Sequence, residues 1–469
     1  MAKVLLIDPP FHRFMNFHRH YFPLGLAYIA AVLNGYHDVL IYDAEQCSTT
    51  RPKIYSEITE DYRYYLLGLR DTCHPIWNEI LEVVKRTNPD IIGISALSVK
   101  VPVVLRIIQI IKEFNEDICI IVGGEHATAL PDEFLKNGAD FIVRGEGEMI
   151  MLELVNAIES GQDVKNISGI SFMENNTIHN NPRRQLIENL DSLPFPEREK
   201  FFDSRGYRPI DFGLIMGSRG CVYNCHFCPN RNIWGNQIRT RSVESVIKEI
   251  ELAKNKFGTK YFSFRDYSFT YKRKWVIDFC HALKKNNLDI EWECLTRCDI
   301  IDNDLIRLMM KQGCINFRIG IESGSERILK FMNKGITIPV ITNAAKILND
   351  NKAFWSSYFI FGVPEETKSD IYETLALIER IDPSFVSMSR FTPMPGTYFY
   401  DYLIKNGKLN GKLTEPINWA EWGNQYLGRN FMKNVTKEEF VSLIGNISKM
   451  IDERNKYKSN GRLDPLLSQ

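Results

Sequence analysis

Short apolar runs alternate with longer amphipathic segments over the first 160 or so residues. Strand-length apolar runs that alternate with helical patterns are typical of a parallel sheet covered by helices. The patterns predict strands at 4–7, 39–42, 91–95, 119–122 and 141–143, and helices at 24–33, 76–85, 101–114, 130–136 and 149–158. We therefore predict an α/β unit with a doubly wound parallel sheet, in which ligands bind at the carboxyl ends of the strands.

A second alternating series begins near residue 206. Its patterns predict strands at 214–216, 261–264, 292–295, 316–319, 357–361 and 385–389, and helices at 243–257, 275–284, 304–311 and 370–381. Six successive βα units favour a partial or complete (β/α)6 barrel, a shortened TIM barrel, over another open sheet. Periodicity alone leaves the closure of this barrel open.

Two stretches lie outside these series. Residues 169–172 and 177–179 predict a hairpin, and the Leu-Pro-Phe-Pro segment at 193–196 predicts an extended linker. A polar helical pattern at 437–455 predicts a helix near the C-terminus. We expect the domain ranges 1–165 for the first sheet, 166–205 for hairpin and linker, 206–400 for the barrel and 401–469 for a mostly helical extension.

Composition narrows the class of protein. The 469 residues correspond to about three structural units at roughly 150 residues each. Hydrophobic residues make up 44% of the chain, and 58 Lys plus Arg balance 58 Asp plus Glu, so no global positive field indicates a nucleic-acid partner. The chain has neither a signal-peptide pattern nor an apolar run long enough to span a membrane. We expect a cytoplasmic protein without membrane insertion.

One loop carries three closely spaced cysteines, and the other seven are dispersed. After the strand predicted at 214–216, a Gly-flanked segment contains Cys221, Cys225 and Cys228, with no fourth cysteine before Cys280. Thiolates are the ligands of iron–sulfur clusters, and three of them leave one iron open for another ligand. His226 offers an alternative, a closed Cys3His zinc site, and three unmodified buried thiols are a further alternative.

This segment resembles the radical S-adenosylmethionine (SAM) enzymes, whose CxxxCxΦC signature is matched by Cys221 to Cys228 with Phe227 before the last cysteine. The resemblance implies a 4Fe–4S cluster, SAM bound to its open iron and cleaved to methionine and a 5′-deoxyadenosyl radical, and an external reductant such as flavodoxin or ferredoxin. Turns after the later strands resemble the family's SAM-contacting segments. The SAM-binding residues that this implies are Phe227, Phe264, Asp266, Arg297, Glu322, Gly362 and Pro364. Each turn alone could instead be a loop that needs Gly or Pro, or a helix cap.

Loops after the N-terminal strands are rich in glycine and small hydroxyl residues, which let a backbone approach a large ligand closely. They contain no GxGxxG, so a nicotinamide site is poorly supported. They resemble the cobalamin-binding, Rossmann-like domain fused to one radical SAM subfamily. The cobalamin-binding residues implied are Pro10, His12, Ser95, Leu97, Ser98, Gly123, Gly124, Glu125, His126, Gly145, Glu146 and Gly147.

The cobalt-ligating DxHxxG motif of other cobalamin proteins is missing, because the chain reads Asp8-Pro9-Pro10-Phe11-His12. Many members of the subfamily lack it too. His12, His18 and His20 could ligate a metal or face solvent, whereas His126 lies nearer the expected cobalt face, where a packing role is the alternative. An empty, degenerate cobalamin domain is a further alternative.

The resemblance implies a cobalamin-dependent radical SAM enzyme that methylates an unactivated carbon, or a phosphinate phosphorus, of a small molecule. Alternatives are an oxidative cyclase or ring-rearranging enzyme without net methyl transfer, a non-catalytic cobalamin or redox sensor, and a tRNA-modifying methylthiotransferase. The last lacks support, because the chain has no second three-cysteine cluster and no basic C-terminal domain. The aromatic segment at 418–422 could be core or a lid. We expect the seven remaining cysteines to be small buried hydrophobes, with Cys294 and Cys298 facing the cavity as the alternative.

Overall fold

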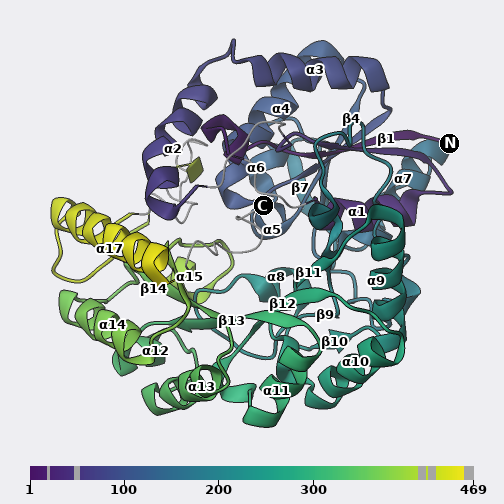
Figure 1. The fold of residues 1–469 in the computed structure, drawn as a ribbon. Coiled ribbons are helices and arrows are strands. Elements are labelled where there is room, and N and C mark those ends of the chain that lie inside the picture. Colours follow the sequence, from purple (N-terminus) through teal and green to yellow (C-terminus); the bar gives the residue numbers. More distant parts are fainter. Residues whose placement is uncertain (18–21, 47–52, 410–418, 421–428, 459–469) are drawn as a thin grey trace.

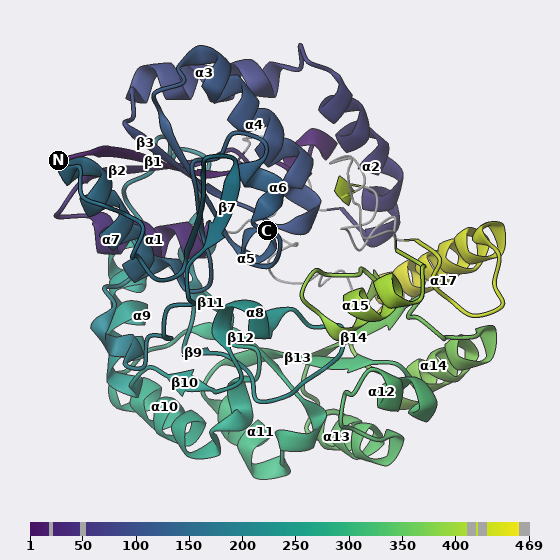
Figure 2. The same ribbon diagram turned by 180° about the vertical axis from the view of Figure 1, so that it is seen from behind.

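The computed structural model describes residues 1–17, 22–46, 53–409, 419–420 and 429–458. Two α/β units lie against each other, the first (purple to blue) above the second (teal to green) in Figure 1, and the same arrangement is seen from behind in Figure 2. Helix α17 (Lys437–Lys458) lies beside the second unit and contacts α2 (Tyr55–Arg70) of the first. The two units therefore touch through the later helices as well as through their facing loops.

The first unit is built on a seven-stranded sheet with the strand order β2-β1-β3-β4-β5-β6-β7. Strands β1 to β5 are parallel, and β3 has the buried, β-branched sequence expected of a strand covered on both faces. The strands are β1 (Lys3–Asp8), β2 (Asp38–Asp43), β3 (Ile91–Ser95), β4 (Cys119–Gly123), β5 (Phe141–Val143), β6 (Ile170–Glu174) and β7 (Thr177–Asn180). The helices besides α2 are α1 (Leu24–Leu33), α3 (Pro75–Thr87), α4 (Val101–Phe114), α5 (Glu125–Ala129), α6 (Asp132–Leu135) and α7 (Gly147–Ser160).

The hairpin expected within a linker belongs to the first sheet. Strand β6 pairs antiparallel with β5, and β7 pairs antiparallel with β6. The turn between them consists of Asn175 and Asn176, both in the left-handed region with φ of 47° and 61°, as a tight hairpin requires. The local pattern predicted the hairpin correctly, but the pairing with β5 depends on long-range contacts that no local pattern contains.

The second unit is an open barrel of six parallel strands in the order β15-β14-β13-β12-β11-β8. Most of its helices lie on the outside of the curved sheet (Figures 1 and 2). The strands are β8 (Leu214–Ile215), β11 (Tyr261–Phe264), β12 (Glu291–Thr296), β13 (Cys314–Glu322), β14 (Trp355–Phe361) and β15 (Phe385–Arg390). The helices are α8 (Asn230–Trp234), α9 (Val243–Phe257), α10 (Arg273–Lys285), α11 (Asn303–Lys311), α12 (Glu326–Phe331), α13 (Ile338–Asp350), α14 (Lys368–Ile381) and α15 (Tyr398–Lys405).

Within the described residues β8 and β15 are not paired, so the barrel is partial. A short antiparallel ribbon of β9 (Ser218–Arg219) and β10 (Arg239–Thr240) brackets the cysteine loop. The predicted helices did not include α2, α5, α8, α12, α13 and α15. Pro339 obscured the start of α13, although proline is well tolerated in a first helical turn.

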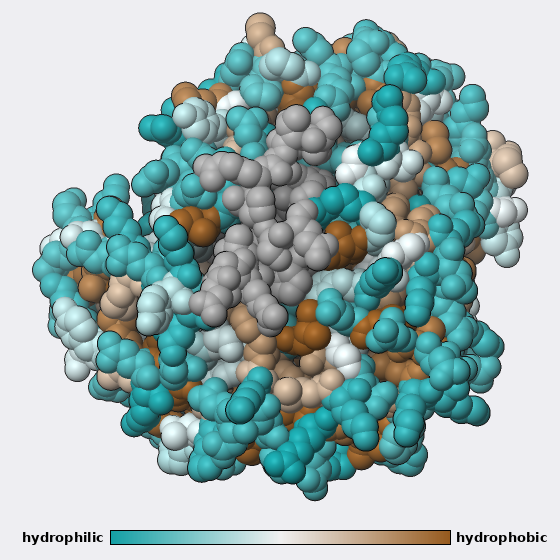
Figure 3. Space-filling view, in the orientation of Figure 1, coloured by the Kyte–Doolittle hydropathy of each residue, from teal (hydrophilic) through white to brown (hydrophobic). Residues whose placement is uncertain are grey.

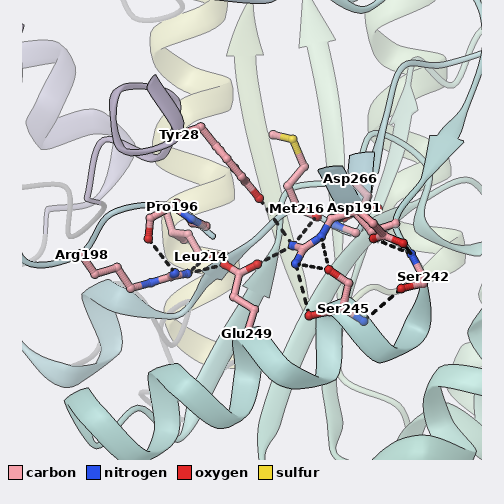
Figure 4. A network of polar contacts seen from close by, with 12 residues as sticks. Tyr28, Asp191, Pro196, Arg198, Leu214, Met216, Ser242, Ser245, Glu249 and Asp266 are labelled. Carbon is pink, nitrogen blue, oxygen red and sulfur yellow. Dashed lines mark hydrogen bonds and ion pairs between the residues drawn. The ribbon is translucent and has the colours of Figure 1, made fainter. Parts of the chain in front are cut away.

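A buried charge network joins the linker to the barrel (Figure 4). Glu249 of α9 accepts a hydrogen bond from Arg198 at 2.6 Å, and its second oxygen accepts one from Arg241. The Arg241 guanidinium also lies 3.5 Å from the hydroxyl of Tyr28 in α1. All three charged side chains are buried, so one carboxylate compensates two guanidinium groups inside the protein.

Hydrophilic side chains predominate on the face shown in Figure 3, and apolar ones form small separate patches. Among the helices of the described ranges, none is long and apolar enough to cross a membrane.

Candidate active site

A cavity of about 590 Å³ lies between the two units. Its barrel wall includes Cys221, Cys225 and Cys228, and its N-terminal wall includes Phe11, His12, Leu97, Val99 and Lys100. The carboxyl ends of the barrel strands complete it with polar groups and with the apolar side chains of Leu295, Phe359, Ile360, Phe391 and Met394. The three predicted cluster cysteines and loops of the first unit therefore line the same cavity.

Asp266, after β11, holds the start of the cysteine loop. It accepts hydrogen bonds from the Gly217 amide at 3.0 Å and from the Ser218 hydroxyl at 2.5 Å, and burial raises its pKa to about 6. Gly220 has φ of 90°, and a Cβ there would lie 1.9 Å from the Gln237 carbonyl oxygen, so only glycine fits this position. Asp266 therefore orders the loop and is not part of the cavity wall.

The three cysteines are free thiols, and burial favours the neutral form of Cys225 and Cys228. Burial raises the pKa of Cys225 and raises that of Cys228 to about 12. Such sulfurs become thiolates when a metal supplies compensating positive charge, as iron ligation requires. Three cavity-facing thiols in one glycine-shaped loop thus fit an iron–sulfur cluster.

The zinc alternative gains no support from His226, which does not line the cavity with the three cysteines. Nδ1 of His226 lies 2.7 Å from the carbonyl oxygen of Phe331, and its ring stacks on Tyr398 with centroids 4.0 Å apart. Within the described ranges no three His, Cys, Asp or Glu side chains converge on a single-ion site. His226 is a packing residue.

Two ion pairs lie at the carboxyl ends of β12 and β13. Lys334 donates to Glu322 at 2.6 Å, and Arg297 makes a two-pronged pair with Asp299 at 2.9 and 3.0 Å. Arg297 also lies 3.5 Å from the ring centroid of Tyr223. Lys334, Arg297 and Glu322 all line the cavity. The Arg297 guanidinium, which was expected to pair with a carboxylate of the ligand, already pairs with the carboxylate of Asp299.

Three of the seven predicted SAM residues line the cavity: Phe227, Arg297 and Glu322. Phe264 packs in the barrel core against Phe269 and Trp292, so only its backbone could reach a ligand. Gly362 donates its amide to Glu366 at 2.6 Å, which shapes the turn that contains Pro364. Gly362 and Pro364 lie outside the cavity wall.

A second pocket of about 300 Å³ opens at the carboxyl ends of the first sheet. Its lining includes the predicted cobalamin residues Ser95, Leu97, Gly123, Gly124, Gly145, Glu146 and Gly147. Leu97 lines both this pocket and the larger cavity. Gly124 has φ of 102°, and a Cβ there would lie 2.9 Å from the Ala96 carbonyl oxygen, so the loop depends on glycine. A narrow, glycine-lined, mostly apolar pocket beside the larger cavity fits an extended part of a large cofactor.

Both ring nitrogens of His126 are engaged, Nδ1 with the Ser98 hydroxyl at 2.9 Å and Nε2 with Glu133 at 2.8 Å. The ring also meets Trp419 edge-on. His126 and Ser98 are therefore structural, and the packing alternative holds for His126. Pro10 is buried after β1 and lines neither space.

Glu125 lies outside both linings, yet its charge acts on Cys228 and Tyr267, and burial raises its pKa to about 7. Its carboxyl group is therefore close to the cysteine loop but not in the wall of the cavity.

Sequence patterns missed a mostly buried charge cluster that includes Lys100 and His12 of the N-terminal wall. Lys100 binds Asp8 at 2.9 Å and Glu45 at 3.2 Å, and Glu45 also meets His12 Nδ1 at 3.2 Å. Asp8 ends β1 and Glu45 follows β2. Their positions could have identified them as candidate site residues, because ligands bind at the carboxyl ends of the strands in such sheets. Lys334, in the turn before α13, has no motif that would have identified it.

Several expectations concern other residues. Cys73 is exposed, which contradicts its expected burial, and Cys119 is half-buried. The buried cysteines are Cys280, Cys294, Cys298 and Cys314. Cys294 and Cys298 lie in the barrel core and not in the cavity wall. His18, His20, Cys47 and most of the segment 418–422 lie outside the described residues.

Residues 215–378 match the Radical SAM superfamily, and residues 15–155 match the B12 binding domain. The chain is 33% identical over 403 residues to an uncharacterized methyltransferase of Pyrococcus horikoshii, covering 85% of this chain and 81% of that protein.

The chain belongs to the cobalamin-binding radical SAM enzymes. The radical SAM domain implies a 4Fe–4S cluster and SAM, and the B12 domain implies cobalamin. The cysteine loop lies within the first matched range, and the glycines that line the second pocket lie within the other.

Other relatives in this group differ in reaction. An anaerobic magnesium-protoporphyrin IX monomethyl ester cyclase of Rubrivivax gelatinosus is 30% identical, covering 84% of this chain and 68% of that one. A cytidylyl-2-hydroxyethylphosphonate methyltransferase of Streptomyces wedmorensis is 27% identical, covering 86% and 82%.

Solved structures of cobalamin-binding radical SAM enzymes have the same fold. The methyltransferase TsrM of Kitasatospora setae superposes with a TM-score of 0.70 at 18% identity, covering 87% of this chain and 78% of that one. The cobalamin-dependent enzyme OxsB gives 0.65 at 18% identity, covering 96% and 62%.

Proposed function

We propose that this radical SAM enzyme is a cobalamin-dependent methyltransferase that acts on an unactivated carbon, or a phosphinate phosphorus, of a small molecule. The main support for the proposal is the 590 Å³ cavity, which is lined both by the cluster cysteines and by loops of the cobalamin domain. Two methyltransferases among the relatives support the choice of reaction.

When bound, SAM at the cluster supplies a hydrogen-abstracting radical, and cobalamin supplies a methyl group. The chain's own residues bind and enclose the reactants. Phe359, Ile360 and Phe391 give the cavity an apolar side that excludes water from reactive intermediates. In the same cavity wall, the Glu322 and Lys334 pair offers a carboxylate oxygen and an ammonium group to polar parts of the bound nucleotide.

An oxidative cyclisation is the second candidate, favoured by the Rubrivivax gelatinosus cyclase at 30% identity. It uses the same radical chemistry and the same cavity without net methyl transfer. The two reactions differ in their products, because methylation consumes SAM both as radical source and as methyl donor.

Product analysis tests the proposal. The protein is purified anaerobically with cobalamin supplied, assayed for iron, sulfide and cobalt, then reduced and incubated with deuteromethyl-SAM and a small-molecule extract. Methylation yields a labelled product with both S-adenosylhomocysteine and 5′-deoxyadenosine. Deoxyadenosine without the homocysteine product indicates the cyclase, and no SAM cleavage indicates a non-catalytic sensor. Cys225→Ala is expected to lose iron and turnover, whereas Cys73→Ala, at an exposed cysteine, is expected to keep both.

The proposal also includes an external one-electron reductant of the flavodoxin or ferredoxin type, since the cluster must be reduced before SAM is cleaved. It places the enzyme in the cytoplasm, where thiols stay reduced. Activity that depends on added flavodoxin and its reductase would support this part.

A further inference from the structure

Arg219 connects the cysteine loop to the N-terminal pocket. It lies in β9, two residues before Cys221, and its guanidinium donates to Glu146 at 2.9 Å and to Glu148 at 2.5 Å. Glu146 also accepts from Arg239 in the paired strand β10 at 2.8 Å. Arg219, Glu146 and Glu148 have side chains 2 to 6% exposed, so the bridge is shielded from water.

Both carboxylates belong to the wall of the 300 Å³ pocket, where the loop between β5 and α7 approaches the barrel. The opposite flank of the cysteine loop reaches the same pocket. Ile233 and Trp234 of α8, which begins two residues after Cys228, also line it. Trp234 in turn donates to the Tyr267 hydroxyl at 3.2 Å, and Tyr267 lines the larger cavity. Segments on both sides of the three cysteines are therefore in contact with the pocket.

Glu148 has an oxygen left for a ligand. One oxygen binds Arg219, while the other is buried and has no hydrogen-bond partner among the described residues. A buried carboxylate oxygen without a donor carries a desolvation cost that a ligand hydroxyl or amide would relieve. Glu148 itself belongs to the lining of the 300 Å³ pocket.

We infer that occupancy of the N-terminal pocket and the stability of the iron–sulfur loop are coupled through Arg219. A ligand that donates to Glu148 fixes this carboxylate, which fixes Arg219 and with it the segment that enters Cys221. If the carboxylates of Glu146 and Glu148 were not held in place, the buried positive charge of Arg219 would be poorly compensated. Ordering of the pocket therefore favours ordering of the cysteine loop. Such coupling is reciprocal, because a change in one affinity requires an equal change in the other.

The inference rests on cobalamin as the ligand, as in the proposed function. The probe is hydroxocobalamin, added to anaerobically reconstituted protein. Two quantities are measured: the rate at which a ferrous chelator removes iron with and without the probe, and the dissociation constant of the probe with and without the cluster. Coupling energies of proteins typically correspond to about 5 to 150-fold, and we expect about tenfold slower iron loss in the presence of the probe.

Arg219→Lys and the isosteric Glu148→Gln test the link, since each keeps its side chain's size or charge type. Both are expected to reduce the protection to below about twofold. Glu153→Gln is the matched control, because Glu153 lies on the same helix as Glu148 in an exposed pair with Arg184 and should retain full protection. For each variant, the rate of iron loss without the probe is divided by the rate with the probe. This ratio separates coupling from a simple loss of affinity or stability.

Each outcome is decisive. Protection lost in both variants and kept in the control supports the inference. Full protection in either variant overturns it, as does probe binding that leaves iron release unchanged in the unmodified protein. If the unmodified protein binds no hydroxocobalamin, the proposed function fails together with the inference.

Discussion

Lys334 donates a 2.6 Å hydrogen bond to Glu322, and the pair lies in the wall of the cavity that the three cysteines line. Glu322 adopts φ of 74°, a left-handed conformation unusual for glutamate, at a register shift between β13 and β14. Backbone strain of this kind occurs at ligand sites, where the surrounding structure holds it in place. The pair thus fixes a carboxylate toward the cavity at a point where the strand is distorted.

Removing one member of this pair is expected to destabilise the protein strongly. Lys334→Met leaves the buried Glu322 carboxylate uncompensated, at a cost of about 3 to 5 kcal/mol in the free energy of unfolding. The double variant with Glu322→Gln should recover most of this loss. Urea unfolding of the metal-free protein measures both, with Lys346→Met in an exposed pair as the control that changes little. Equal stability of the single and double variants would contradict the role of the pair.

Asp266 should make stability depend on pH. Burial raises its pKa from the usual 3.8 to about 6 in the folded protein, so the folded state holds this proton more tightly than the unfolded state. Its contribution is most favourable below pH 4 and is lost as the pH rises to about 6, at about 1.4 kcal/mol per pH unit. Relative to Asp266→Asn, the unmodified protein should lose stability between pH 4 and 6. Urea midpoints of both proteins across this range measure the difference, and a constant difference would refute the assignment.

His126→Ala is expected to lower stability without changing cobalamin coordination. The substitution leaves the buried Ser98 and the half-buried Glu133 without the imidazole, which costs about 1 to 3 kcal/mol. Because both ring nitrogens are already engaged, the visible spectrum of bound hydroxocobalamin should remain that of the unmodified protein. A spectral shift that follows the loss of the imidazole would show that His126 ligates cobalt after all.

Glu249→Gln should be far more damaging than a substitution on the exposed face of the same helix. It leaves the buried Arg198 and Arg241 guanidinium groups without their shared carboxylate, with an expected cost of about 3 to 5 kcal/mol. Glu244→Gln, in an exposed pair with Lys248, should leave the urea midpoint unchanged. Similar midpoints for the two variants would mean that the network of Figure 4 contributes little.

Hydrophobic periodicity predicted the strands of both sheets well. Alternation of apolar runs and helices is strong wherever a strand is buried on both faces, as in β3, and there the predicted range of 91–95 agrees with the structure. Helix α2 was missed because it is rich in polar and aromatic residues and follows a segment without a clear start signal. Pairing of β5 with β6 depends on contacts between residues far apart in sequence, which periodicity does not encode.

The candidate site was predictable where a motif fixes both residue type and spacing. Cys221, Cys225 and Cys228 line one cavity, and the glycine-rich loops of the first sheet line the adjoining pocket. Side chains with several available partners were not predictable: Arg297 binds Asp299, and Asp266 holds the cysteine loop instead of facing the cavity. Such choices depend on tertiary neighbours and not on the local sequence.

Because β6 and β7 complete the first sheet at Asn180, every strand of that sheet precedes Leu214, where the barrel begins. During synthesis on the ribosome, the nascent chain can therefore bury its N-terminal core before the barrel strands emerge. The cysteine loop, translated afterwards, would then meet a preformed surface carrying Glu146 and Glu148, which acts as a template for Arg219.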